Sequence, residues 1–305
     1  MEKMITAYKN GNANIFIYEE GTRVIAWPDE EELKLNFPVS MDFKITNWCD
    51  ENCPMCHEMS NPEGKHGDIM NLEFINHLHA GIEIALGGGK VTSHPDLIPF
   101  LKKLKSLGII PSITVHQNEY ALNKDLIKSL IEDKLIYGLG VSYSHQNLAL
   151  WDEIFSYPNA VAHVIAGYHN NDVFNYLTKY PNAKILILGY KHWGRGAKYN
   201  LGQETTIKNN IEDLKENLFS YVKNCKVVSF DNLAIEQLDI RNKVGEKYWE
   251  EFYQGDDGTM TMYVDGVKEE FARTSISPRR YKLKDTIEEM FKIIKGEICN
   301  DICNE

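Results

Sequence analysis

The chain of 305 residues lacks any long apolar run, and this absence excludes an ordinary membrane-spanning helix. Such a helix needs roughly 20 predominantly apolar residues, and no segment of the sequence approaches that length. The opening segment, Met1 to Thr6, also has no apolar stretch of the kind found in a cleavable secretory signal. We therefore expect no membrane partner for this protein.

Cysteine is scarce, and the six cysteines of the chain are unevenly distributed. Three fall in one short segment, at Cys49, Cys53 and Cys56, and the others are Cys225, Cys299 and Cys303. Without a secretory context this distribution does not indicate a disulfide framework. A reducing, cytoplasmic location is the expectation.

Positive charge is in short supply as well, because 33 Lys and Arg face 44 Asp and Glu and leave a net charge of −11. Binding to the backbone of DNA or RNA depends on a basic surface that displaces counterions, so bulk nucleic-acid binding is not expected. A local basic group remains at Lys191, Arg195 and Lys198, and its plainest interpretation is a solvated face.

From Pro38 onward, short strand-like segments alternate with longer helical ones, which is typical of parallel β/α units. The predicted strands are Val39–Ile45, Ile82–Leu86, Ile110–Val115, Ile136–Ser142, Ala160–Ala166 and Ile185–Leu188, with Val227–Phe230 as a possible seventh. The predicted helices are Leu72–Ala80, Pro95–Leu107, Lys124–Glu132, Leu148–Phe155, Asp172–Lys179 and Ile207–Val222.

Six such units predict an α/β fold whose core, residues 37–230, is an open, partial (β/α)6 barrel of the TIM type. Residues 1–36 precede it and contain a β-hairpin that turns at Glu19–Thr22. Residues 231–305 lose the alternation. A glycine turn at Gly255–Gly258 and a strand-like stretch at 259–265 indicate a small α+β cap that closes the barrel.

Polar residues follow most of the predicted strands, at the end where parallel β/α folds carry their chemistry. Lys191 and Arg195 follow the sixth strand, and such a pair can clamp a carboxylate or phosphate of a substrate. A surface loop whose arginine pairs with an acidic residue is the alternative. The full set of substrate-contact candidates is His116, Asn118, Lys191, Arg195 and Asp231.

The most informative motif is Cys-x3-Cys-x2-Cys, formed by Cys49, Cys53 and Cys56 just after the first strand of the core. Closely spaced thiolates suit either an iron-sulfur cluster or zinc. Structural zinc needs four protein ligands, and His57 is available as the fourth. Three thiolates alone can hold three irons of a cubane cluster and leave the fourth iron open.

This spacing, together with Gly87-Gly88-Gly89 and His94-Pro95-Asp96-Leu97 one strand later, resembles the radical S-adenosylmethionine (radical SAM) superfamily over residues 37 to 230. The resemblance implies a [4Fe–4S] cluster on the three cysteines, with SAM chelated by the open iron. It also implies reductive cleavage of SAM to a 5′-deoxyadenosyl radical that abstracts a substrate hydrogen, fed by an electron donor such as flavodoxin or ferredoxin. The implied SAM contacts are Met55, Gly87, Gly88, Gly89, Ser142, Ser144 and Gly167.

The sequence departs from the family pattern at Lys90 and Val91, where related proteins have a glutamate and a proline. A protonated lysine cannot accept a hydrogen bond from the SAM ammonium and would repel it. Either the glycine carbonyls suffice for SAM, or Lys90 points away, or it contacts a carboxylate.

The expected function is therefore a radical SAM enzyme whose substrate is a peptide, or a small molecule or nucleotide with a carboxylate or phosphate. A role as an activating enzyme that installs a glycyl radical on a partner protein is also open. The alternatives from other classes are a non-catalytic zinc-binding module and a one-electron iron-sulfur carrier. An auxiliary cluster at Cys299 and Cys303 would need Cys225 or a non-cysteine ligand nearby.

Overall fold

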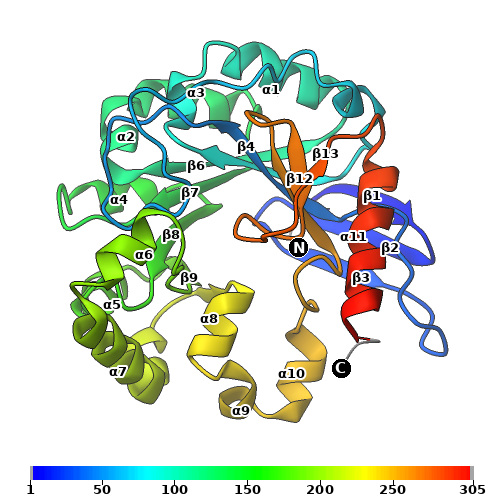
Figure 1. Cartoon of the computed structure of the whole chain (residues 1–305). Helices are drawn as coiled ribbons and strands as arrows, with labels where there is room; N and C mark the ends of the chain where they lie inside the picture. The colour runs from blue at the N-terminus through cyan, green and yellow to red at the C-terminus, as the bar shows by residue number, and fades with distance from the viewer. Residues whose placement is uncertain (1–2, 303–305) are drawn as a thin grey trace.

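A ten-stranded sheet organises the chain, in the order β10-β9-β8-β7-β6-β5-β4-β11-β12-β13 (Figure 1). The structure, a computed structural model, describes residues 3–302, with side chains described for residues 3–296. Cys303 and the side chain of Cys299 lie outside this described part. Within the described part, no helix is both long enough and apolar enough to cross a membrane.

The strands β4 to β10 run parallel to one another in sequence order. Their positions agree with all seven predicted strands to within a few residues. Their bounds are β4 Ser40–Thr46, β5 Glu83–Gly88, β6 Ile110–His116, β7 Gly138–Ser142, β8 Ala160–Ile165, β9 Lys184–Leu188 and β10 Val227–Phe230.

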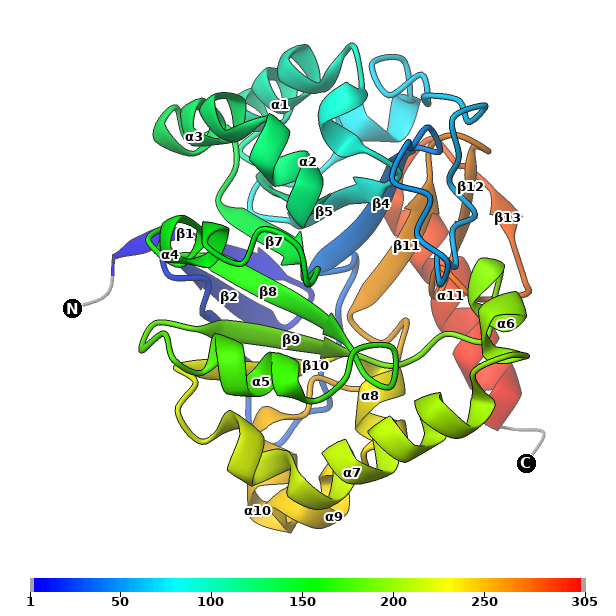
Figure 2. The same ribbon diagram turned by 90° about the vertical axis from the view of Figure 1, so that its left-hand side faces the viewer.

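Helices cover the outer face of this sheet, as Figures 1 and 2 show. In α1 the buried side chains Leu97, Phe100, Leu101 and Leu104 follow the spacing of one helical face, which packs on the sheet. The bounds are α1 Leu97–Ser106, α2 Gln117–Leu122, α3 Lys124–Glu132, α4 Leu150–Ile154, α5 Asp172–Leu177 and α7 Glu204–Val222.

The helix predicted over residues 72–80 is wrong. That segment contains only a short 3-10 helix, Glu73–His77, between extended residues. The buried side chains of the segment are Leu72, Phe74, Ile75 and Leu78, and the extended backbone at Leu72 and Leu78 limits the helix to a short 3-10 segment.

The parallel strands separate a dry core from an internal cavity. On β4, Met41 and Ile45 are buried in the core, whereas Asp42 and Lys44 border the cavity. Because side chains alternate along a strand, every second residue of the neighbouring strands also faces inward. These inward residues include Ala85, Ser112, Thr114, Gly140, His163, Leu186 and Ser229.

The C-terminal strands continue the main sheet, and they do not form a separate cap as the sequence led us to expect. β11, Thr261–Asp265, pairs in parallel with β4, and β12, Glu270–Ala272, and β13, Tyr281–Lys282, follow antiparallel. Strand β11 fits there because Met262 and Val264 are buried in the same core, while Tyr263 faces the cavity. Helices α8 Asn232–Gln237, α9 Ile240–Val244 and α10 Glu246–Phe252 connect β10 to β11 (Figure 1).

The N-terminal segment forms a second, three-stranded antiparallel sheet: β1 Met4–Asn10, β2 Ala13–Tyr18 and β3 Arg23–Ala26. The predicted hairpin is β2–β3, and β1 was not predicted. An ion pair of 2.7 Å between Arg23 and Glu83 joins this sheet to β5 at the end of the strands away from the cysteines. Ile17, Tyr18 and Gly21 line the cavity there, so the small sheet covers its floor.

Candidate functional site

A cavity of about 690 Å³ occupies the centre of the curved sheet and reaches the carboxyl ends of its strands. Most of the residues singled out in the sequence border it, namely Cys49, Cys53, Met55, Cys56, Gly87, Gly88, Gly89, His116, Ser142, Lys191, Arg195 and Asp231. Asn118, Ser144 and Gly167 do not border it. Segments far apart in sequence thus meet around one space.

The three thiols of Cys49, Cys53 and Cys56 are partly buried in the loop after β4. Burial raises the pKa of Cys49, and burial with the neighbouring thiols raises the pKa of Cys53 to about 11. Three ionised thiols in this setting require a cation to balance them. Within the described residues, no three His, Cys, Asp or Glu side chains converge closely enough to bind a single metal ion.

The cysteine loop is held by Arg195, the first residue of α6, Arg195–Asn200. Its guanidinium donates from Nε to the Cys53 carbonyl at 3.0 Å and from Nη1 to the Ser60 carbonyl at 2.9 Å. Its backbone N–H donates to the Cys56 carbonyl at 3.1 Å. Arg195 therefore braces the cysteine loop, and two of its donors are not free to clamp a substrate.

The glycines that flank Arg195 allow the two loops to touch. Gly194 has a φ of 57°, and a Cβ atom there would lie 2.5 Å from the His57 carbonyl oxygen. At Gly196 a Cβ atom would lie 2.4 Å from the Lys191 carbonyl oxygen. Contacts this short exclude any side chain, so only glycine permits this approach.

The glycine-rich segment after β5 packs on the other side of the cysteine loop. The backbone N–H groups of Gly89 and Lys90 donate to Thr46 and Trp48, both at 2.8 Å. A Cβ atom at Gly89 would lie 2.1 Å from the Trp48 carbonyl oxygen, whereas Gly87 has open space around the same position. Gly87 therefore leaves room beside the cysteines.

Lys90 contacts a carboxylate, which is one of the three possibilities stated for this lysine in the sequence analysis. Its ammonium lies 2.7 and 3.0 Å from the two carboxylate oxygens of Asp50, between the first two cysteines. The hydrogen bond to Lys90 holds the pKa of Asp50 below its ordinary value. The lysine charge is thus neutralised within the cysteine loop, which removes the repulsion that a SAM ammonium would meet from an unpaired lysine.

Two glutamates that the sequence did not single out border the cavity beside the cysteines. Glu51 accepts a hydrogen bond of 3.0 Å from Asn118, so Asn118 supports the cysteine loop from α2. Glu119 is almost fully buried and accepts bonds of 2.8 Å from the backbone N–H and the hydroxyl of Thr92. Burial raises its pKa to about 7.

The two serines and Gly167 differ in position. Ser142 borders the cavity, but Ser144 lies in the following loop, where its N–H donates to Gln117 at 2.9 Å. Gly167 has a φ of 79° and packs against Ile207 and Ile211 of α7. Neither Ser144 nor Gly167 is among the residues that line the cavity, and a SAM contact at either stays a prediction.

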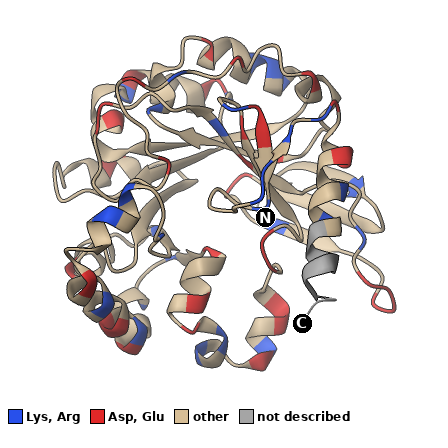
Figure 3. Ribbon diagram, in the orientation of Figure 1, with Lys and Arg blue, Asp and Glu red and all other residues tan. Residues whose placement is uncertain are grey.

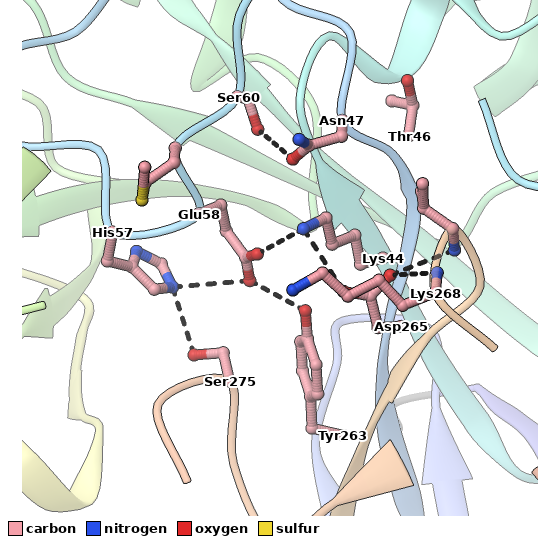
Figure 4. A network of polar contacts seen from close by, with 12 residues as sticks. Lys44, Thr46, Asn47, His57, Glu58, Ser60, Tyr263, Asp265, Lys268 and Ser275 are labelled. Atoms are coloured by element: carbon pink, nitrogen blue, oxygen red, sulfur yellow. Dashed lines mark hydrogen bonds and ion pairs between the residues drawn. The ribbon is translucent and has the colours of Figure 1, made fainter. Parts of the chain in front are cut away.

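A polar network joins the cysteine loop to β4 and β11 (Figure 4). The Glu58 carboxylate lies 2.7 Å from the Lys44 ammonium and accepts a bond of 2.9 Å from the Tyr263 hydroxyl. The His57 ring bonds Ser275 at 3.1 Å, so its Nε2 is directed at the loop after β12. Sequence reasoning missed Tyr263 and Ser275 because no motif links them to the cysteines.

Cys225 is the fourth cysteine whose side chain the structure describes; it follows α7 and packs against the main core. Burial raises the pKa of its thiol to about 11. Cys225 is not among the residues that line the cavity.

No family model matches the sequence, and no curated protein matches it significantly. Solved structures of SuiB from Streptococcus suis are similar in fold. SuiB bound to the precursor peptide SuiA has a TM-score of 0.61 at 12% identity, with 95% of this chain and 88% of that chain covered. SuiB bound to S-adenosylmethionine has a TM-score of 0.58 at 12% identity, with 95% and 87% covered. At this identity the likeness establishes a shared fold.

Proposed function

We propose that this chain is a radical SAM enzyme that holds a [4Fe–4S] cluster through Cys49, Cys53 and Cys56. The observation that carries the proposal is the convergence of the three thiols and Gly87 on the wall of one cavity, at the carboxyl ends of parallel strands. SuiB binds S-adenosylmethionine in one of its solved structures, which supports the same cofactor here.

A cluster fits these thiols better than one zinc ion does. The described residues contain no set of three ligands that converges on a single ion. In a cubane cluster each thiolate binds a different iron, so the sulfur atoms stay further apart. His57, the fourth ligand of the zinc hypothesis, directs its Nε2 to Ser275.

Cys49, Cys53 and Cys56 would hold the cluster, and the chemistry that it would supply is the one-electron reduction that cleaves SAM to methionine and a 5′-deoxyadenosyl radical, which would abstract a substrate hydrogen. Within this chain, Arg195 and Asn118 brace the cysteine loop. Gly87 leaves the open space beside it that the SAM amino acid group requires. The enclosing wall limits the access of water to a reactive intermediate.

For the substrate, we propose a peptide as the first class to test, because the fold neighbour SuiB binds a precursor peptide. A small molecule or nucleotide remains a second class. We further propose a one-electron donor such as flavodoxin or ferredoxin, since a cluster of this kind must be reduced before each SAM cleavage.

The test is anaerobic reconstitution with iron and sulfide, followed by dithionite and SAM and quantification of 5′-deoxyadenosine. A Cys53→Ala variant is run beside the wild type, and Cys225→Ala serves as the matched control because this thiol packs away from the cavity. We expect 5′-deoxyadenosine from the wild type and from Cys225→Ala, and none from Cys53→Ala.

Two results would overturn the proposal. Stoichiometric zinc without sulfide would favour the non-catalytic zinc module. An assembled cluster that neither binds nor cleaves SAM would favour the one-electron carrier.

A further inference from the structure

The floor of the cavity has an unpaired carboxylate at Asp42. This residue is on β4, and its neighbours in the sheet are Ala85 of β5 and Tyr263 of β11. Gly87 pairs with Lys44, two residues further along β4, so Asp42 lies about 7 Å deeper than Gly87 at the usual rise of a strand. Asp42 is therefore below the segment proposed for SAM.

The Asp42 carboxylate makes no hydrogen bond or ion pair with any described residue, and its side chain is exposed to the cavity that it borders. Burial raises its pKa, and the carboxylates Asp257, Asp231 and Glu58 act in the same direction, while Lys191 opposes them. Asp42 is therefore an unpaired carboxylate whose side chain is open to the cavity.

The cationic side chains of the cavity wall do not pair with the Asp42 carboxylate. Six carboxylates and three cationic side chains line the cavity, and one of the carboxylates, Glu83, is paired with Arg23 at 2.7 Å. They are Asp42, Glu51, Glu58, Glu83, Glu119 and Asp231, and Lys44, Lys191 and Arg195. The Lys44 ammonium is shared by Glu58 and Asp265 at 2.7 and 3.4 Å. Arg195 is bonded to the cysteine loop.

Lys191 is the cation whose charge favours the ionised form of Asp42, but the Lys191 ammonium forms no ion pair with a described carboxylate. Its ammonium donates to the Ser275 hydroxyl at 3.2 Å. Asp231 uses one carboxylate oxygen to accept from the N–H groups of Gly189 and Ala234, both at 2.8 Å. Its second oxygen, like both oxygens of Asp42, has no partner in the described structure.

We propose that the cavity floor binds an aliphatic ammonium or guanidinium group of the substrate, with Asp42 as its principal partner and Asp231 beside it. That the bound cation belongs to a substrate rests on the proposed function, whereas the cation site itself is argued from the cavity alone. The assignment differs from the anionic substrate group that Lys191 and Arg195 suggest by sequence, because Arg195 is engaged elsewhere and negative charge prevails around Lys191.

The test measures dissociation constants by ligand-observed NMR for four probes of similar size: n-butylammonium, n-butylguanidinium, n-butyrate and n-butanol. The reconstituted protein is used at pH 8 with saturating SAM, and the protein as purified is used in parallel. We expect the two cations to bind more tightly than butanol, and butyrate more weakly. Asp42→Asn should weaken the cations about tenfold or more and leave butanol unchanged.

Two further variants separate charge from folding. Asp125→Asn removes the same charge from an exposed, unpaired position on α3 and should match the wild type. Lys191→Met removes the competing cation and should tighten cation binding severalfold, a change opposite in sign to damage of the fold. Preferred binding of butyrate, or cation binding that Asp42→Asn does not alter, would overturn the assignment.

The same titration with the capped tripeptides Ac-Gly-Lys-Gly-NH2 and Ac-Gly-Arg-Gly-NH2 identifies the source of the cation. Binding tighter than that of the butyl probes supports the side chain of a polypeptide, and weaker binding supports a small amine. Both results retain the cation site. Failure of SAM cleavage is read separately from 5′-deoxyadenosine, so the cation site and the proposed reaction can fail independently.

Discussion

Arg195 connects the start of α6 to the cysteine loop through three hydrogen bonds. For these bonds the planar geometry of the guanidinium matters more than its charge. The carbonyl groups of Cys53 and Ser60 both accept from the planar guanidinium, and Cys56 accepts from the backbone N–H. A lysine cannot reproduce two directed bonds from one planar group. Arg195 is therefore a positioning residue for the cysteine loop.

Arg195→Ala should reduce the iron and sulfide retained per chain after reconstitution and lower the free energy of unfolding by about 2–4 kcal/mol. Arg195→Lys should restore only part of the loss. Lys198→Ala, an exposed change on the same helix, is the control and should behave as the wild type. Equal iron retention by Arg195→Ala and Lys198→Ala would show that the loop does not depend on this side chain.

Glu119 should make stability depend on pH with a predictable sign. Its pKa is about 7 in the folded protein and 4.5 ordinarily, so between these values the folded state holds a proton that the unfolded chain has released. The free energy of unfolding therefore falls as pH rises through this window, by on the order of 3 kcal/mol from this residue. Glu119→Gln removes this contribution.

Urea denaturation at pH 5 and pH 8 checks the effect. The free energy of unfolding of Glu119→Gln, taken relative to that of the wild type, should be higher at pH 8 than at pH 5. The amide oxygen of the variant can still accept the hydrogen bonds that Thr92 donates. The same pH dependence in both proteins would contradict the shifted pKa.

At the scale of elements, the site depends on close backbone contact between loops that follow three different strands. The loop before α6 lies against the cysteine loop at Gly194, and the loop after β5 lies against it at Gly89. Glycine appears at these points because any Cβ would collide with a carbonyl group. The glycine triplet thus serves packing at Gly89 and open space at Gly87.

Gly194→Ala should destabilise the protein by about 1–3 kcal/mol, because alanine would be strained at a φ of 57° and would collide with the His57 carbonyl. We also expect faster loss of iron to a chelator. Gly202→Ala is the matched control, since nothing lies within 4 Å of the Cβ position there. Thermal denaturation and iron release measure the two effects, and similar behaviour of both variants would refute the contact.

At the scale of the whole molecule, both ends of the described chain pack together beneath the main sheet. Phe291 of α11, Ile287–Ile302, is fully buried against Ala13, Ile15 and Ile17 of the small sheet. Positive and negative charges are interspersed along the outer helices such as α7 (Figure 3). The unbalanced negative charge that we interpret functionally is the one inside the cavity.

Phe291→Ala should lower the free energy of unfolding by about 3–5 kcal/mol and reduce hydrogen-exchange protection in β1–β3 more than in β4–β9. Phe252→Ala, at a side chain that is 62% exposed, should change stability little. A uniform loss of protection across both sheets would show that the small sheet unfolds only together with the main one.

Much of the main sheet was predictable because local alternation reports burial directly. The pattern around Met41 and Phe43 predicts β4, and the same rule holds through β10. The position of β11 was not predictable, since its pairing with β4 joins residues more than 200 positions apart. Nothing local in Thr261–Asp265 distinguishes a separate hairpin from an added parallel strand.

The sequence alone determined the seven strands β4 to β10 and where three cysteines and a glycine triplet fall relative to them, because these depend on neighbours in the chain. Only the tertiary structure decided the partners of Lys90 and Arg195 and left Asp42 without one. Charge pairing depends on distances across the fold, and those distances arise when several strands curve around one cavity. The sign of the charge at its floor is therefore a property of the packed molecule.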